Sequence, residues 1–154
     1  MPKFLFLFHQ FAKQHHELDP LLQGKNVSEL GQRPLSGKWS IHEHVAHLGR
    51  YQEIFQERCM RILTEDSPAF ARYRAEDDPG FSLWCNKDWE LIRIDLLQQR
   101  VALIEKLGEL SEEDWQRSGS HPKLGRLPLH EWLRFFVLHE SHHFYSIFWL
   151  IHTS

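Results

Sequence analysis

Two histidines four residues apart, His139 and His143, are the residues of this sequence best suited to chemistry. In a helix this spacing places both imidazoles on one face, one turn apart. The same apolar stripe carries Trp132, Phe136 and Leu150, so both histidines are expected to face the core. Unpaired buried polar groups cost roughly 1–3 kcal/mol each, and a shared divalent cation would satisfy both rings. The pair therefore predicts a metal site, the alternative being two histidines hydrogen-bonded to buried backbone, serine or tyrosine.

A third ligand has to come from another helix, and the sequence offers many histidines, 12 in 154 residues. His47 is the preferred candidate, because it flanks Leu48 and Tyr51 on the core side of a predicted helix. On spacing alone, His44, one turn earlier, and His15, on the apolar stripe of the first helix, stay open as alternatives.

Residues 139–143, HESHH, also match the H-E-x-x-H motif, in which zinc proteases use two histidine ligands and a glutamate base. The extended form of that motif needs glycine and histidine where Ser146 and Trp149 stand. No β-rich half precedes the motif either. These departures exclude a zinc protease.

Four amphipathic segments must position these histidines. Apolar residues recur at helical spacing over four ranges: 4–22, 40 to about 63, 86–108, and 128 onward. Ser40 and Glu43 form a capping box at the start of the second segment. Pro128 suits the first helical position of the fourth segment, because its fixed φ is helical.

The joints between these segments set the architecture. Residues 64–80 are rich in proline and aspartate and form the longest connection, and residues 111–115 predict a single helical turn. Strand-type alternation never persists for more than a few residues. The sequence therefore predicts an all-α fold, a four-helix bundle with a long crossover between helices two and three, as a single domain over residues 1–154.

Composition narrows the class of protein further. Eighteen basic against 21 acidic residues argue against a nucleic-acid binder. No apolar run reaches the roughly 18 residues of a membrane span, and Phe4 to Phe8 is too short for a signal peptide. Cys59 and Cys85 lack C-x-x-C spacing, which favours a reducing, cytoplasmic setting. Charged residues of helices two and three are expected on solvated faces, among them Glu53, Glu57, Arg58, Arg93 and Arg100.

Three pieces of the chain together resemble the DinB/YfiT-like superfamily, to which metal-dependent enzyme activity is attributed. Residues 37–48, GKWSIHEHVAHL, resemble its W-S-x-x-E-x-x-x-H-L signature. Residues 121–129, HPKLGRLPL, are similar to its H-P-x-x-G-x-L-x-L approach to the last helix, and 139–143 match its H-x-x-x-H pair. Many relatives have glutamine where Ser146 stands here.

The resemblance implies a four-helix bundle, usually a homodimer, with a divalent-metal site formed by His47, His139 and His143. Zinc and nickel are the expected ions. Three imidazoles leave a coordination position open, where water or a low-molecular-weight thiol becomes a nucleophile near neutral pH. Glu140 or Tyr51 is then a candidate base or orienting group, and the two candidates for supporting the ligands are His44 and His142.

The predicted function is therefore a metal-dependent enzyme that acts on a small molecule by thiol-dependent transfer or hydrolysis. Members of the superfamily include thiol-dependent S-transferases and isomerases. The alternative is a non-catalytic metal-binding helical module in a stress response. Aromatic residues of 144–149 lie off the core stripe, which agrees with the homodimer that the resemblance implies. No nucleic-acid or membrane partner is expected.

Overall fold

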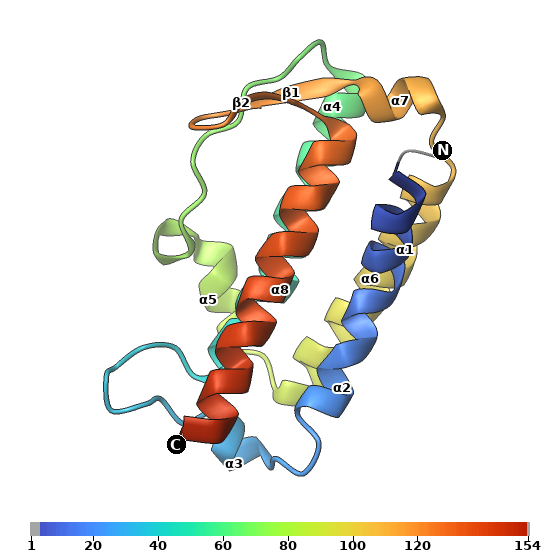
Figure 1. Cartoon of the computed structure of the whole chain (residues 1–154). Helices are drawn as coiled ribbons and strands as arrows, with labels where there is room; N and C mark the ends of the chain where they lie inside the picture. The colour runs from blue at the N-terminus through green and yellow to red at the C-terminus, as the bar shows by residue number, and fades with distance from the viewer. Residues whose placement is uncertain (1–3, 154) are drawn as a thin grey trace.

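The chain folds into a four-helix bundle, seen in the computed structural model, which describes residues 4–153 (Figure 1). Its long helices are α1 (Leu5–Gln14) with its continuation η2 (His15–Glu17) and α2 (Leu18–Leu21), α4 (Ile41–Thr64), α6 (Trp89–Gly108) and α8 (Leu129–Thr153). The shorter elements are α3 (Val27–Leu30), η3 (Ala75–Asp77), α5 (Pro79–Cys85), α7 (Glu112–Gln116), β1 (Ser118–His121) and β2 (Gly125–Pro128). The expected all-α four-helix bundle is thereby confirmed.

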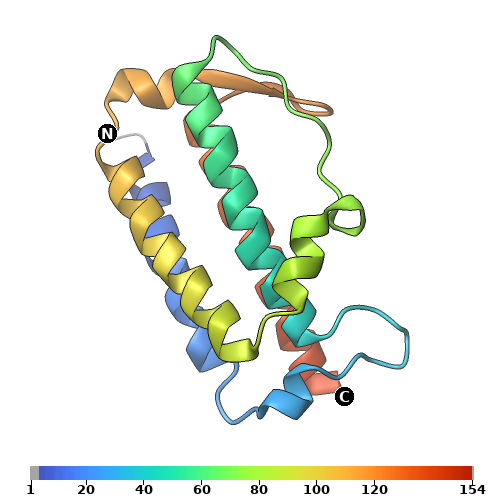
Figure 2. The ribbon, with the colours of Figure 1, turned by 180° about the vertical axis from the view of Figure 1, so that it is seen from behind.

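The order of the helices explains the long crossover. Figures 1 and 2 show α8 beside α4, and α1 beside α6, with α4 and α6 running in the same direction. Because α4 and α6 are parallel, the chain has to return the length of the bundle between them. Residues 65–88 do so along the outside of α4, and α5 packs on α4 during the return.

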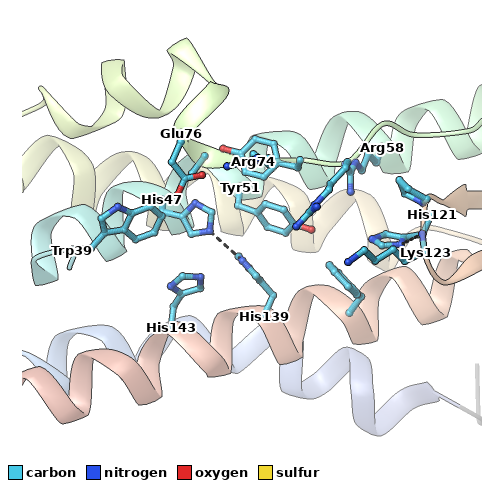
Figure 3. Close-up of a pocket in the computed structure, with 15 residues that line it drawn as sticks. Trp39, His47, Tyr51, Arg58, Arg74, Glu76, His121, Lys123, His139 and His143 are labelled. Carbon is cyan, nitrogen blue, oxygen red and sulfur yellow. Dashed lines mark hydrogen bonds between the residues drawn. The ribbon is translucent and has the colours of Figure 1, made fainter. Parts of the chain in front are cut away.

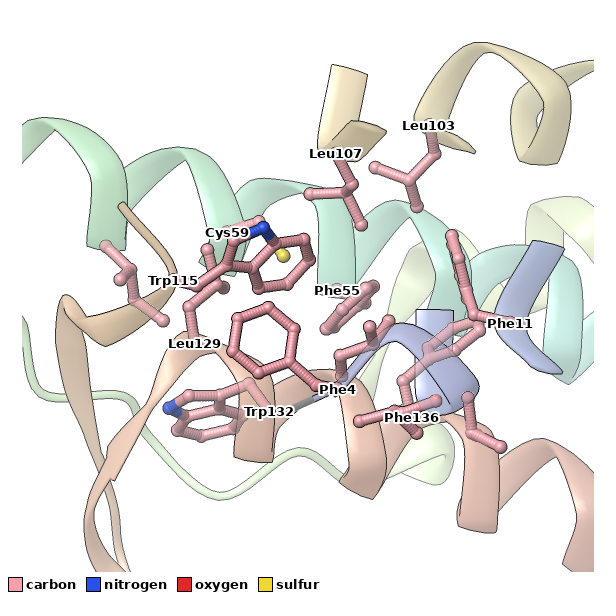
Figure 4. Packing of buried hydrophobic residues seen from close by; sticks show 14 of the residues in the cluster. Phe4, Phe11, Phe55, Cys59, Leu103, Leu107, Trp115, Leu129, Trp132 and Phe136 are labelled. Atoms are coloured by element: carbon pink, nitrogen blue, oxygen red, sulfur yellow. The ribbon is translucent and has the colours of Figure 1, made fainter. Parts of the chain in front are cut away.

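The core consists of two apolar clusters separated by a polar layer. One cluster includes Phe11, Phe55, Leu103 and Phe136 (Figure 4). The other occupies the opposite half of the bundle and contains, among others, Leu18, Leu48, Leu96 and Ile147. Each long helix contributes one polar residue where its members of one cluster give way to those of the other: Gln14, Gln52 (next to Tyr51 of the first cluster), Arg100 and Glu140.

Arg100 is the centre of this polar layer, with none of its side chain exposed. Its guanidinium donates to Gln52 Oε1 at 2.6 Å, to the Phe11 carbonyl at 3.2 Å and to the Glu140 carboxylate. Gln14 Nε2 donates to the other Glu140 oxygen at 3.0 Å. The layer thus ties all four long helices together, and the expectation that Arg100 lies on a solvated face is wrong.

Three local features of the chain go beyond the four helical segments expected from the sequence. Residues 118–128 form an antiparallel hairpin in which Ser118 pairs with Pro128 and His121 with Gly125. The connection after the first helix contains the short helix α3. The first helix is interrupted by the 3₁₀ turn η2, because Pro20 has no N–H to donate to the carbonyl four residues earlier.

The predicted helix starts are accurate where caps define them. The Ser40 hydroxyl accepts the Glu43 amide at 3.1 Å, and the Glu43 carboxylate accepts the Ser40 amide at 3.0 Å. Ser111 and Asp114 form the same reciprocal pair before α7. No helix of the described chain is long and apolar enough to cross a membrane.

Gly49 allows α5 to lie directly on α4. A Cβ at this position would come within 2.2 Å of the Trp84 ring, whose Nε1 donates to Glu53 at 2.8 Å. Gly49→Ala is therefore expected to lower the free energy of unfolding by about 1–3 kcal/mol, because α5 must move away. Urea denaturation measures the change. Gly31→Ala, where no neighbouring atom lies closer than 3.8 Å, is the control, and equal effects of the two substitutions would contradict this packing.

Candidate metal centre

His47 of α4 and His139 and His143 of α8 converge between the two helices (Figure 3). One ring nitrogen from each lies within 4.8 Å of the others, and the Nε2 atoms of His47 and His139 are 3.1 Å apart. Among the residues that the structure describes, no other three metal-binding side chains converge in this way. The structure therefore brings together the three residues that the sequence selected; their role as ligands stays a prediction.

The capping box of α4 sets the rotation and start of the helix that carries His47. Trp39 directly precedes the cap, and its ring lies 5.1 Å from the His47 ring and 6.1 Å from the His143 ring. Phe81 of α5 covers His47 from another side, at 6.0 Å. The W-S-x-x-E part of the sequence thus positions both a ligand candidate and an aromatic wall beside it.

All three histidines are neutral at pH 7. Burial lowers the pKa of His47 to about 4, that of His139 to about 3 and that of His143 to about 2, and neighbouring imidazoles lower the pKa values further. A neutral imidazole has one nitrogen lone pair, which is the form that binds metals. The site therefore meets the electrostatic requirement for a cation held by nitrogen ligands.

The ring nitrogens that face each other give an independent test of fit. The Nδ1 atoms of His47 and His139 are buried and have no hydrogen-bond partner, while their Nε2 atoms face each other. Two facing nitrogens need either a shared proton or a shared cation between them. Ligands about 2.0–2.1 Å from a tetrahedral zinc lie roughly 3.3 Å apart, close to the separation seen here. The donor set fits a divalent metal ion.

His44 lies beside the group without joining it. Its Nδ1 is 2.9 Å from the Nδ1 of His143, which leaves the Nε2 of His143 available as a ligand atom. Such contacts fix the orientation and tautomer of a metal-binding histidine. His142 is exposed, with its ring 5.5 Å from that of His143. His15 is buried near Arg100 and is not part of the group, so it is excluded as the third ligand.

The two candidate bases occupy different places. Tyr51 lines the site, with its ring 4.1 Å from that of His139, and burial raises the pKa of its hydroxyl to about 12. Glu140 points away from the histidines on another side of α8, where Arg100 and Gln14 bind its carboxylate. The interpretation of Glu140 as a base is wrong, because one residue along a helix turns the side chain by about 100°.

The histidines form part of the wall of an open cavity of about 640 Å³ (Figure 3). Several lining residues were not selected from the sequence, because they come from the crossover or the hairpin turn rather than from a helical stripe. They are Tyr73, Arg72, Arg74, Glu76, His121 and Lys123. Glu76 is the single acidic residue among those that line the cavity. A second cavity, about 760 Å³, shares Trp39 and Glu76 with the first.

Fold and site together define a class of protein: a four-helix bundle with three neutral histidines from two adjacent helices at an open cavity. The model of the DinB superfamily matches residues 10–147, and the chain belongs to that superfamily. This finding confirms the family predicted from the three sequence motifs.

A solved structure supports the same fold. The chain is similar to YfiT from Bacillus subtilis, described as a probable metal-dependent hydrolase with an unusual four-helix bundle topology. The match has a TM-score of 0.78 and 20% sequence identity, and covers 94% of this chain and 83% of that chain. No curated protein matches the chain.

Proposed function

We propose that this protein is a metal-dependent enzyme that uses His47, His139 and His143 to hold a divalent cation, with zinc and nickel as candidates. The observation that carries the proposal is the convergence of three neutral imidazoles at the wall of an open cavity. A structural zinc site is closed by four protein ligands, whereas three ligands beside a cavity leave room for water or substrate. The description of YfiT as a probable metal-dependent hydrolase agrees with this proposal.

A cation in this site would lower the pKa of a bound water or low-molecular-weight thiol and so supply a nucleophile near neutral pH. The chain provides the surroundings. The rings of Trp39, Phe81 and Tyr51 pack against the histidines and give the site an aromatic wall. Glu76 carries the cavity's one carboxylate and is the proposed proton acceptor in place of Glu140.

An activity panel tests the proposal. The rates of metal-loaded and metal-stripped protein are compared in two assays. One assay contains a small thiol and an electrophile, and the other contains activated esters and amides without a thiol. We expect activity in one arm, its loss on stripping, and a loss of about 100-fold in Glu76→Gln with unchanged metal content. Asp77→Asn, an exposed neighbour outside the cavity, is the matched control. Equal rates for loaded and stripped protein in every arm would contradict the enzyme proposal.

The second candidate function is a non-catalytic metal-binding helical module in a stress response. It is favoured if the bound cation has no exchangeable solvent, because a purely structural site is closed. Water-proton relaxation of protein loaded with Ni²⁺ or Mn²⁺ separates the two functions. The enzyme proposal expects an enhancement from inner-sphere water that is suppressed by an added thiol or anion.

We also propose that the protein forms a homodimer through the exposed face of α8. Leu138, Tyr145, Phe148 and Trp149 are large apolar side chains that this helix exposes. The rings of Tyr145 and Trp149 contact each other at 6.2 Å, and exposed apolar patches commonly mark interaction sites. Light scattering of the wild-type protein is expected to give twice the mass of the chain. The double variant Tyr145→Ser/Trp149→Ser is expected to give the mass of the monomer. Leu91→Ser, an exposed apolar residue of α6, is the control; a monomeric wild type would refute the dimer.

A further inference from the structure

Arg58 is a buried cation at the wall of the cavity without a carboxylate partner. Only 8% of its side chain is exposed, and it lines the same cavity as the three histidines. Its Nη2 donates to the Ala71 carbonyl at 3.0 Å, and its guanidinium lies over the rings of Phe70 and Trp132, at 5.4 and 5.5 Å. These contacts hold the side chain in place but leave its charge uncompensated.

The other buried arginine of the described chain, Arg100, differs from Arg58 because its charge has a counterion. Arg100 is bound by the Glu140 carboxylate within the polar layer. Within residues 4–153 no ion pair is found for Arg58. A buried charge is tolerated when an opposite charge or several hydrogen bonds reach it, and Arg58 is open to the cavity instead. The missing opposite charge can therefore come from a ligand.

Further basic side chains gather at the same end of the cavity. Lys123 and His121 belong to the hairpin turn, and Arg72 to the crossover, and all three line the cavity. The backbone amides of Lys123 and Leu124 donate to His121 Nδ1 at 3.0 and 3.1 Å, so the imidazole proton lies on Nε2 and can be donated. Among the described residues, Arg72 and Lys123 have no carboxylate within ion-pair distance.

The lining cations that have no carboxylate partner gather at one end of the cavity. Figure 3 shows Arg58, His121 and Lys123 at the end away from Trp39, whereas Arg74 lies beside Glu76, near the histidines. Arg74 is paired with Asp77 at 3.6 Å. A substrate with an anionic group would therefore enter in one orientation. Its charge would lie at the basic end, and its reacting bond would lie at the histidines.

We propose that the basic end of the cavity, formed by Arg58, Arg72, His121 and Lys123, is a binding site for the anionic group of the substrate. The substrate class is then a small molecule with a carboxylate or phosphate group separate from its reactive centre. Guanidinium groups bind both oxyanions through paired hydrogen bonds. The inference rests on the proposed function, since it specifies the substrate of that same site.

The test is a binding titration of the full-length, metal-free protein followed by NMR. Succinate and inorganic phosphate are added separately, with sodium chloride keeping the ionic strength constant. We expect saturable shifts at Arg58 Nε–H and at the backbone amides of His121, Lys123 and Leu124. The anion that binds more tightly identifies the carboxylate or the phosphate as the preferred group. Because no metal is present, this result is independent of whether the protein binds metal or catalyses a reaction.

Substitutions make the test specific. Arg58→Gln is expected to weaken binding about tenfold or more, and Lys123→Gln by about threefold, because each removes a charge-assisted contact. Lys123 is exposed, so its substitution keeps the test valid if Arg58→Gln does not fold. Arg61→Gln is the matched control, since Arg61 lies on the same helix and is paired with Glu65. The proposal is overturned if neither anion shifts residues 121–124, or if Lys123→Gln and Arg61→Gln bind alike.

Discussion

Glu140→Gln is expected to lower the free energy of unfolding of the metal-free protein by about 3–5 kcal/mol, measured by urea denaturation. The Glu140 carboxylate is 2% exposed and is the counterion of Arg100, which is fully buried between the two apolar clusters. A neutral amide leaves the guanidinium charge in the core without compensation. The remaining partners of Arg100 are the Gln52 side chain and the Phe11 carbonyl, which are both uncharged.

Two further variants separate this effect from a general sensitivity of α8. Glu131→Gln removes a carboxylate from an exposed pair with Arg134 and should change the stability by no more than about 1 kcal/mol. Arg100→Met combined with Glu140→Leu removes both charges and should recover most of the lost stability, as replacement of buried ion pairs by apolar residues commonly does. A loss below about 1 kcal/mol in Glu140→Gln would show that the buried pair does not stabilise the bundle.

Zn²⁺ is expected to raise the melting temperature of the wild-type protein by roughly 10 °C at a free concentration a thousandfold above its dissociation constant. A ligand that binds only the folded state stabilises it by about 4 kcal/mol at that ratio. His47, His139 and His143 come together only when α4 packs on α8, so the unfolded chain lacks the site.

His139→Ala should lose most of this stabilisation, because it removes one of three nitrogens from the site. The control is His152→Ala, an exposed histidine further along the same helix, which should keep the full shift. Thermal unfolding followed by circular dichroism, with and without Zn²⁺, gives both values. An equal shift in wild type and His139→Ala would place the bound ion elsewhere.

The four-helix bundle and the pair His139 and His143 were predictable from local periodicity, whereas His47 was only preferred on spacing and was implied by the resemblance to the DinB/YfiT-like superfamily. His139 and His143 share one stripe of α8, and the cap at Ser40 fixes the start of α4. The sequence pattern does not indicate which neighbouring helix packs against each face of α8. Glu140, one residue further along, therefore looked equally available to the site, although it faces Arg100 of α6.

Contacts between distant segments explain what the sequence could not predict. The strands β1 and β2 are four residues each and too short for an alternating pattern, and a bridge between Ala69 and Ser120 supports them. Arg58 looked like a surface residue of an amphipathic helix, and that expectation is wrong. Its burial follows from Phe70, which the crossover brings back over α4 and onto the guanidinium.

Elemental analysis by mass spectrometry of tag-free protein is the decisive measurement of whether the three histidines bind a metal ion. We expect about one divalent metal per chain in the wild type and in His152→Ala, and little or none in His47→Ala, His139→Ala and His143→Ala. Circular dichroism of each variant establishes that it is folded. Wild-type protein that is folded, carries no metal and takes up neither Zn²⁺ nor Ni²⁺ would contradict the metal centre and, with it, the proposed enzyme.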